Sequence, residues 1–400
     1  MIPLLRKILG MNWLLLLTML ALAIFGVYAI ESAARHLPNG GEYYAQRQKV
    51  WIVVGFIIFL VTALIDYRWI RWLGIPMYLT GLALMIAAIY KGSDVHQINL
   101  GVISFQPTQL GIAGGIVLMA SLLQDLPRWH VFFSLPYIKL AIIALLAGIP
   151  FLIVVAMGDM GSALVWLPVT AVIMLVSGVP YRYMLLLGII GVGCLALAYY
   201  IILPKASERG AERIELYLAM LNDREVDISG DAYAPYWVST SIGKAGWKGL
   251  GWNASSDRGS LHDKKYIPWK TAHNDFIFGV IGEEQGFRGS LLLIIGYTML
   301  LIQCLFVAFY SRDSSGKIIA AAVVALMFSH IFENIGMCIL MTPITGIPLP
   351  LISYSGTFIV MIMFLLGLVQ SVWVHRKIEF EEEEEAPEQQ IRRFTPDTTT

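Results

Sequence analysis

The residues best suited to chemistry lie where a long polar segment gives way to a hydrophobic one. Asp275 stands at this junction, preceded by His273 and Asn274 and followed by an apolar run that begins at Phe276. A carboxylate in such a position can act as a general base that takes a proton from a hydroxyl group. It can equally be a capping acid, because a carboxylate in the first turn of a helix is stabilised by free N–H groups and by the helix dipole.

A helix over residues 275–286 is expected to position this acid. Apolar residues recur in it at helical spacing, and Asn274 or Thr271 can cap its start. Gly286 can end it. This interpretation places Asp275 in the first helical turn.

Further polar side chains interrupt apolar segments. Glu283 and Glu284 follow Asp275 by two turns, and they are either interface residues or support for its carboxylate through a shared proton or cation. Asp159 lies between two hydrophobic runs, where a functional role and a helix cap are both open. Glu333 and Asn334 interrupt another run and are expected to face the interior of a helix bundle.

Two irregular segments lie near these residues in the sequence. The glycine-spaced segment 243–251 permits tight turns and close backbone approach, and its Lys244 and Lys248 could reach an anionic head group. It lacks the Gly-Lys-Ser/Thr ending of a P-loop, so nucleotide binding is not indicated. The proline-broken segment 345–356 contains Ser353, and it is either a cavity wall or an ordinary tight loop.

The composition predicts an all-α, polytopic integral membrane protein. The chain is 57% hydrophobic and 14% charged, whereas soluble domains are roughly a quarter charged, and apolar runs of about 20 residues recur. Residues 1–378 are interpreted as the transmembrane domain and 379–400 as a disordered tail. The net charge of zero and the lack of a basic patch indicate no nucleic-acid partner. About ten spans are expected, at Trp13–Ile30, Val50–Ile65, Met77–Tyr90, Leu110–Leu123, Tyr137–Met157, Ser162–Val179, Tyr183–Leu203, Ser290–Tyr310, Ile318–Met341 and Thr357–Val374.

The distribution of Lys and Arg favours a cytoplasmic location for both termini. Alternate short loops are basic, whereas 158–161 and 342–356 contain no Lys or Arg; segment 31–49 is an exception with three basic residues. Segment 204–274 then lies outside the cytoplasm. Its residues 206–221 resemble an amphipathic helix, lying either at the membrane surface or on a small core of the loop itself.

Several motifs are similar to those of one known family. Residues 273–289 closely resemble the "HTDFIFAVIGEE.G..G" motif of the SEDS proteins, which include RodA, FtsW and SpoVE, and residues 334–356 resemble their "NIGM…P.TGIPLPF.SYGG" motif. Segment 243–251 matches "GSGG..GKG" in spacing, and segments 105–107 and 158–164 look like "FQPSE" and "PDLGTAL". The chain is identified as a member of this family, most similar to RodA.

This resemblance implies a peptidoglycan glycosyltransferase of the bacterial cytoplasmic membrane. It would polymerise lipid II, a disaccharide-pentapeptide on undecaprenyl diphosphate, during cell elongation together with a class B penicillin-binding protein. The family's essential acid corresponds to Asp275, acting as general base or as a ligand of a divalent cation such as Mg²⁺ or Mn²⁺ in an inverting transfer. Burial would raise the pKa of its carboxyl group and a helix N-terminus would lower it, so the sign stays open. Candidate substrate-binding residues are His273, Arg213, Lys244, Lys248, Lys264, Lys265, Asp159 and Ser353, with Glu283, Glu284 and Asn334 in support.

The sequence also departs from the family pattern. Gln109 and Ile112 occupy positions at which relatives carry a Glu and a Lys. Loss of that pair keeps a second hypothesis open, a non-catalytic scaffold for the penicillin-binding protein. An FtsW-like division polymerase and a lipid II flippase are further alternatives; a flippase would be expected to show inverted repeats, and we see no internal repeat.

Overall fold

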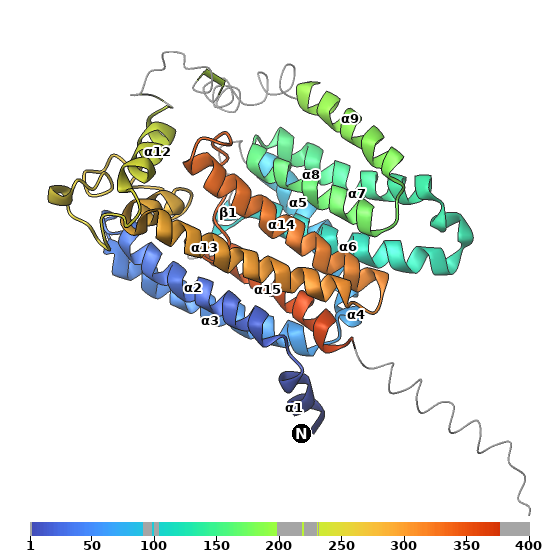
Figure 1. Ribbon diagram of the computed structural model, residues 1–400. Helices are drawn as coiled ribbons and strands as arrows, with labels where there is room; N and C mark the ends of the chain where they lie inside the picture. The colour runs from blue at the N-terminus through green and yellow to red at the C-terminus, as the bar shows by residue number, and fades with distance from the viewer. Residues whose placement is uncertain are drawn as a thin grey trace, which may run out of the picture.

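The computed structural model describes residues 2–90, 98–99, 104–197, 218–219, 230 and 232–376. These residues form an elongated bundle of helices (Figure 1). The helices in chain order are α1 (Ile2–Leu9), α2 (Trp13–Ala33), α3 (Gly40–Leu64), α4 (Tyr67–Ile70), η1 (Arg71–Leu73), α5 (Gly74–Tyr90), α6 (Pro107–Trp129), η2 (Val131–Ser134), α7 (Pro136–Ala156), α8 (Met160–Val176), α9 (Tyr181–Leu197), α12 (Tyr233–Ala245), η4 (Ser256–Arg258), α13 (Ile277–Phe309), α14 (Ser314–Cys338) and α15 (Gly356–Val374). Strands β1 (Ile98–Asn99) and β2 (Ser104–Phe105) form one short antiparallel pair.

Each of the ten predicted spans falls on a helix over its described residues, which confirms the all-α, polytopic membrane fold; residues 198–203 of the seventh span lie outside the described ranges. Within the described ranges, eight helices are long and apolar enough to cross a membrane, and α8 is a shorter apolar helix. The predicted span boundaries leave out polar turns at the ends of the helices. The second span was expected to begin at Val50, whereas α3 begins at Gly40, because hydropathy marks the apolar part of a helix and not the polar turns that extend it.

The start of α13 differs from the sequence-based expectation. The helix begins at Ile277, and its N-cap residue Phe276 makes no side-chain capping bond, so neither Asn274 nor Thr271 caps it. The carbonyl of Thr271 instead accepts the N–H groups of the three residues that end at Phe276. The expected helical position of Asp275 is therefore wrong: the acid lies in a tight turn that precedes the helix.

Gly286 interrupts α13, as predicted. Its φ of 65° and ψ of −164° are not helical, and the second half of the helix continues beyond it. Backbone groups freed at this break bind the glycine-spaced segment: Leu250 N–H to the Glu283 carbonyl, Gly251 N–H to the Glu284 carbonyl, Phe287 N–H to the Gly246 carbonyl and Arg288 N–H to the Trp247 carbonyl, at 2.9–3.2 Å. Segment 243–251 thus acts as a backbone strap across the break, and it confirms the close approach expected of its glycines.

The connections alternate between the two ends of the bundle. At the Asp275 end, Ser32 in the last turn of α2 contacts Glu284, and Gln106 before α6 contacts Asp159. The other end, which we call the distal end, comprises residues 64–73, 125–139, 177–182 and 311–317. Contacts that join these loops include Tyr67 to Asp313, Arg71 to Asp125 and Lys139 to the Ser177 carbonyl. Successive helices therefore run in opposite directions across the bundle.

Helix α14 lies in the middle of the bundle (Figure 1). It is the most enclosed of the candidate spans, with 72% of its apolar window buried. Its polar residues Glu333 and Asn334 are buried, which confirms the expectation that they face the protein interior. In an apolar environment such groups must find partners within the protein.

Candidate active site

The turn that carries Asp275 is fixed through its backbone. Three successive carbonyl groups of the turn each accept one hydrogen bond from the C-terminal third of the chain: the His273 carbonyl from Tyr354 N–H (2.9 Å), the Asn274 carbonyl from Ser353 Oγ (2.6 Å) and the Asp275 carbonyl from Asn334 Nδ2 (2.8 Å). Hydrogen bonds of this kind orient a backbone without using the side chain. They define where the Asp275 carboxylate projects.

The same donors also fix the proline-broken loop beside the turn. Asn334 Nδ2 donates a second hydrogen bond, of 2.7 Å, to the Ile347 carbonyl, so one buried amide joins the turn to the loop. Gly346 of this loop faces the turn, and a Cβ placed on it would be 3.7 Å from Asp275 Oδ2. The carboxylate therefore lies against this loop, and Ser353 contributes as a positioning residue.

His273 forms one side of the turn. Its ring lies 5.0 Å from that of Tyr44 and 5.4 Å from that of Tyr354, centroid to centroid. Burial lowers the pKa of His273 to about 4, so the imidazole is neutral at pH 7. It packs and shapes the turn, and at neutral pH it does not supply a positive charge for a substrate.

Helix α3 contributes two residues that the sequence reasoning did not single out. Gln48 Nε2 donates to the Ser353 carbonyl at 3.4 Å. Arg47 is half-buried, donates to the Tyr43 hydroxyl at 3.0 Å and interacts electrostatically with Tyr354. The sequence did contain a signal for Arg47, because it belongs to segment 31–49, whose basic residues are the exception to the distribution of Lys and Arg among the loops. It places a cation beside the candidate site.

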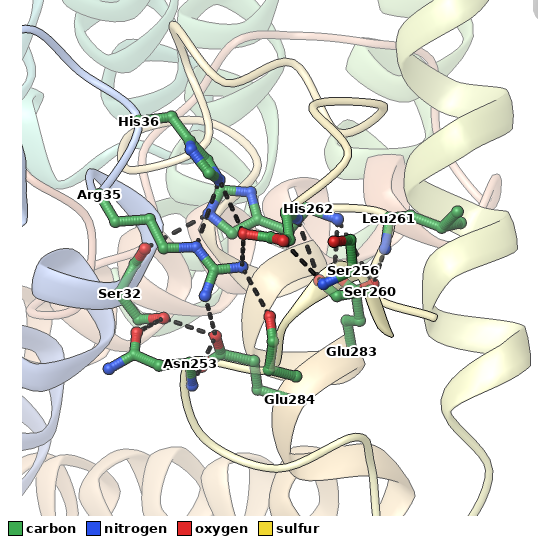
Figure 2. Close-up of polar contacts among 12 residues, drawn as sticks. Ser32, Arg35, His36, Asn253, Ser256, Ser260, Leu261, His262, Glu283 and Glu284 are labelled. Atoms are coloured by element: carbon green, nitrogen blue, oxygen red, sulfur yellow. Dashed lines mark hydrogen bonds and ion pairs between the residues drawn. The ribbon is translucent and has the colours of Figure 1, made fainter. Parts of the chain in front are cut away.

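Glu283 and Glu284 anchor the described part of segment 204–274, which we call the outer loop, to the bundle (Figure 2). Their carboxylates accept hydrogen bonds from the loop and from α2: Glu283 from the N–H groups of Leu261 and His262 (the latter at 3.1 Å), and Glu284 from Ser32 Oγ (2.5 Å) and Asn253 N–H (3.2 Å). Of the two expected roles, the structure supports the interface role. We call Glu283, Glu284 and their hydrogen-bond partners in the loop and in α2 the loop anchor.

Arg35 completes the loop anchor (Figure 2). Its guanidinium lies 4.0 Å from the Glu284 carboxylate and 3.7 Å from that of Asp263, so part of the unexpected positive charge in segment 31–49 is matched by acids. His262 is enclosed beside it. Burial lowers the pKa of His262 to about 3, with smaller contributions from the charges of Arg35 and His36.

A buried polar cluster lies behind the proline-broken loop. Asp159 caps α8 by accepting the Ser162 N–H at 3.1 Å, and it also accepts a hydrogen bond of 3.4 Å from Gln106. Glu333 and His330 are close enough to Asp159 to interact with it electrostatically. Asp159 therefore has the capping role and also belongs to a cluster of ionisable groups.

The two positions that depart from the family pattern lie in this region. Ile112 is fully buried in the hydrophobic core. Gln109 is also buried, and its Nε2 lies 3.4 Å from His330 Nε2. A neutral contact between α6 and α14 thus occupies the region of the missing Glu and Lys. This contact joins α6 and α14 without an ion pair.

The predicted phosphate-binding lysines lie on the surface. Lys244, Lys248, Lys264 and Lys265 are exposed, and Lys265 lies 5.7 Å from the ring of Trp269. Their role in substrate binding stays a prediction. Arg213 and residues 206–217 lie outside the described residues, as does the tail 379–400. The described ranges contain no group of three or more His, Cys, Asp or Glu that could hold a metal ion.

Comparison with known proteins finds one protein family that the chain matches. The profile of the family described as "Cell cycle protein", FtsW, RodA and SpoVE, matches residues 10–378. The chain is 29% identical over 373 residues to the peptidoglycan glycosyltransferase MrdB of Escherichia coli strain K12, covering 91% of this chain and 94% of that one. It is 27% identical over 372 residues to the probable peptidoglycan glycosyltransferase FtsW of Trichlorobacter lovleyi, covering 90% and 92%.

Solved structures share the fold. A chain of a structure described as "Structural coordination of polymerization and crosslinking by a peptidoglycan synthase complex" aligns with a TM-score of 0.72 at 23% identity, covering 92% of this chain and 99% of that one. The crystal structure of the Thermus thermophilus rod shape determining protein RodA aligns with a TM-score of 0.64 at 23% identity, covering 92% and 98%. The helix arrangement is therefore one already known among proteins of this kind.

Proposed function

The chain belongs to the FtsW, RodA and SpoVE family of cell cycle proteins, and from this premise we propose that it is a peptidoglycan glycosyltransferase that polymerises lipid II. The relatives named as peptidoglycan glycosyltransferases align over nine-tenths of the chain. The observation that carries the proposal is the rigid presentation of Asp275 by three backbone hydrogen bonds. A general base must be held within hydrogen-bond reach of the proton that it takes.

In this mechanism the Asp275 carboxylate accepts the proton of an acceptor sugar hydroxyl. The hydroxyl oxygen forms a bond to the anomeric carbon of the donor sugar. The bond from that carbon to the diphosphate oxygen breaks, and the diphosphate leaves with the electron pair. A single displacement inverts the anomeric configuration; retention would require a second carboxylate as nucleophile, and the turn 271–276 carries Asp275 as its one acid.

The leaving diphosphate needs positive charge near the Asp275 end. Arg47 is beside the turn, and the exposed lysines at 244, 248, 264 and 265 lie on the outer loop. A divalent cation would supply similar stabilisation. Asp275 would be its protein ligand, and diphosphate oxygens of the substrate would provide other ligands, because the described residues hold no ready-made metal cluster.

The proposed setting is the bacterial cytoplasmic membrane, with the Asp275 end outside. The distal end carries Arg68, Arg71, Arg128, Arg182 and Lys317, and the positive-inside rule places such an end in the cytoplasm. We propose a class B penicillin-binding protein as the partner that cross-links the strands. The fold match to a chain of a peptidoglycan synthase complex supports this pairing.

The direct test is polymerisation of purified lipid II in detergent, with and without a co-purified class B penicillin-binding protein. Wild-type protein should produce glycan strands on a gel, and Asp275→Ala should produce none while it keeps the wild-type unfolding temperature. Strands from the partner alone would have to be absent. No strands from the folded wild type with its partner and Mg²⁺ or Mn²⁺ present would contradict the proposal.

A second candidate function is a scaffold that recruits the penicillin-binding protein without catalysis. The buried Gln109 and Ile112 favour it, since these uncharged side chains stand where the family motif has a Glu and a Lys. A scaffold does not need an acid held on a fixed turn, so the geometry at Asp275 favours the enzyme.

A further inference from the structure

A pocket at the distal end of the bundle has no role in the proposed reaction. Its volume is about 420 Å³, and it opens between the end of α6, the start of α7 and the start of α14. Four basic side chains line it, namely Arg128, Lys139, Arg312 and Lys317. This is a concentration of positive charge at one point on the rim of a membrane protein.

Two acids offset part of this charge and leave the pocket net positive: Asp125 lies 3.9 Å from Arg128, and Asp313 lines the pocket itself. The Asp313 carboxylate accepts hydrogen bonds from the Tyr67 hydroxyl (2.8 Å), the Gly316 N–H (2.8 Å) and Gln124 Nε2 (3.0 Å). These donors come from the bundle and from the start of α14. The acid is thus used in joining three helices, while the basic side chains surround the cavity.

The surroundings favour a lipid over a soluble anion. Trp129 and Tyr137 are exposed on either side of the connection between α6 and α7, next to the basic residues Arg128 and Lys139. Aromatic side chains of this kind sit at the level of lipid head groups. Val131 and Phe132 between them are exposed as well, so apolar surface for acyl chains adjoins the charged pocket.

We propose that this pocket binds the phosphate of an anionic phospholipid in the leaflet at the distal end. Basic pockets between transmembrane helices are suited to such head groups, and Arg matches the geometry of phosphate oxygens. The inference depends on the membrane fold and not on the glycosyl transfer. Its test can therefore succeed or fail independently of the proposed function.

The test uses the purified full-length protein and native mass spectrometry. The probes are dioleoylphosphatidylglycerol, dioleoylphosphatidylcholine and inorganic phosphate. The pocket variant Arg128→Gln/Lys317→Gln should bind phosphatidylglycerol at least tenfold more weakly than wild type. The matched control Arg6→Gln/Arg182→Gln removes the same charge from exposed positions outside the pocket lining, and its affinity should stay within twofold of wild type.

The other probes separate the sources of the phosphate. Phosphatidylcholine should bind wild type and pocket variant equally, and millimolar inorganic phosphate should not displace phosphatidylglycerol. Equal affinities of all three proteins for phosphatidylglycerol would overturn the proposal, as would equal losses in both double variants. Binding of inorganic phosphate without phosphatidylglycerol would overturn the lipid assignment. If the double variant does not fold, the exposed single change Lys317→Gln serves with Arg182→Gln as its control.

Discussion

At the scale of single residues, the site depends on donors that are distant in sequence from the acid they position. The motif around Asp275 could be found in the sequence because its residues are consecutive. The three hydrogen bonds to its turn could not, since they come from residues 59 to 81 positions further along the chain and depend on how α14 packs. Arg47 was missed for the same reason: the sequence placed it in a loop, and only the fold shows that it lies in α3 beside Tyr354.

Asn334 gives the first prediction at this scale. In Asn334→Asp, the near-isosteric side chain cannot donate to the carbonyls of Asp275 and Ile347. We expect polymerisation to fall by roughly 100-fold from misplacement of the acid, and the free energy of unfolding to fall by about 1–3 kcal/mol. Ser329→Ala is a matched control on the same helix, because Ser329 donates only to the Ala325 carbonyl of its own helix. Equal rates in both variants would contradict the positioning role.

His262 gives a prediction about pH. Its pKa is lowered from 6.5 to about 3 by burial, so between these values the unfolded state binds a proton that the folded state does not. Stability from this residue is complete above pH 6.5 and is lost as the pH falls toward 3, at about 1.4 kcal/mol per pH unit.

Thermal unfolding at pH 7.5 and pH 5.0 measures this effect. The drop in unfolding temperature between the two values should be smaller for His262→Gln than for wild type. The exposed His130→Gln should behave as wild type. An unchanged drop in His262→Gln would show that this histidine does not carry the acid sensitivity.

At the scale of elements, hydropathy predicted the ten apolar spans, but it predicted neither α12 nor how the two halves of α13 are held. The break at Gly286 was readable because glycine is the residue that most often ends a helix. The strap was not, since it consists of backbone hydrogen bonds, which any sequence could make if its chain could approach closely enough. The start of α13 was misplaced because a turn closed on one carbonyl, that of Thr271, leaves no side-chain signature.

The break predicts which glycines are essential. Gly286→Ala should lower the free energy of unfolding by at least about 2 kcal/mol, because its backbone conformation is accessible essentially to glycine alone. An added Cβ would also lie 2.2 Å from Gly249 N. Gly243→Ala, in the same glycine-spaced segment, meets nothing within 4 Å inside α12. It should be neutral or stabilise by up to about 1 kcal/mol. Similar unfolding temperatures for the two variants would contradict the strap.

At the scale of the whole molecule, the two ends have different chemistry. The Asp275 end carries the acid-bearing turn, the loop anchor and the outer loop, and the distal end carries basic loops around a pocket of about 420 Å³. Charge counting predicted this division from the sequence. The exception in segment 31–49 is explained in part by Arg35, whose partners Glu284 and Asp263 appear only in the folded chain.

Cysteine labelling tests the orientation. Lys264→Cys should react with a membrane-impermeant maleimide in intact cells, and Arg182→Cys should react only after the membrane is opened, because the two positions lie at opposite ends of the bundle. The labelled proteins also carry Cys194→Ser, and the remaining Cys304 and Cys338 are buried and should contribute little background. The reverse pattern of labelling would place the Asp275 end in the cytoplasm and contradict an extracytoplasmic transfer.

The most direct test of the central claim is the rate of lipid II consumption by wild type, Asp275→Asn and Asp257→Asn. The three proteins should first show the same unfolding temperature. Asp275→Asn keeps the shape of the side chain and removes its basicity, so we predict a loss of about 100-fold to 10,000-fold. Asp257, an exposed acid on the outer loop, should be replaceable at full activity. A rate for Asp275→Asn within a few-fold of wild type would contradict the assignment of Asp275 as the base.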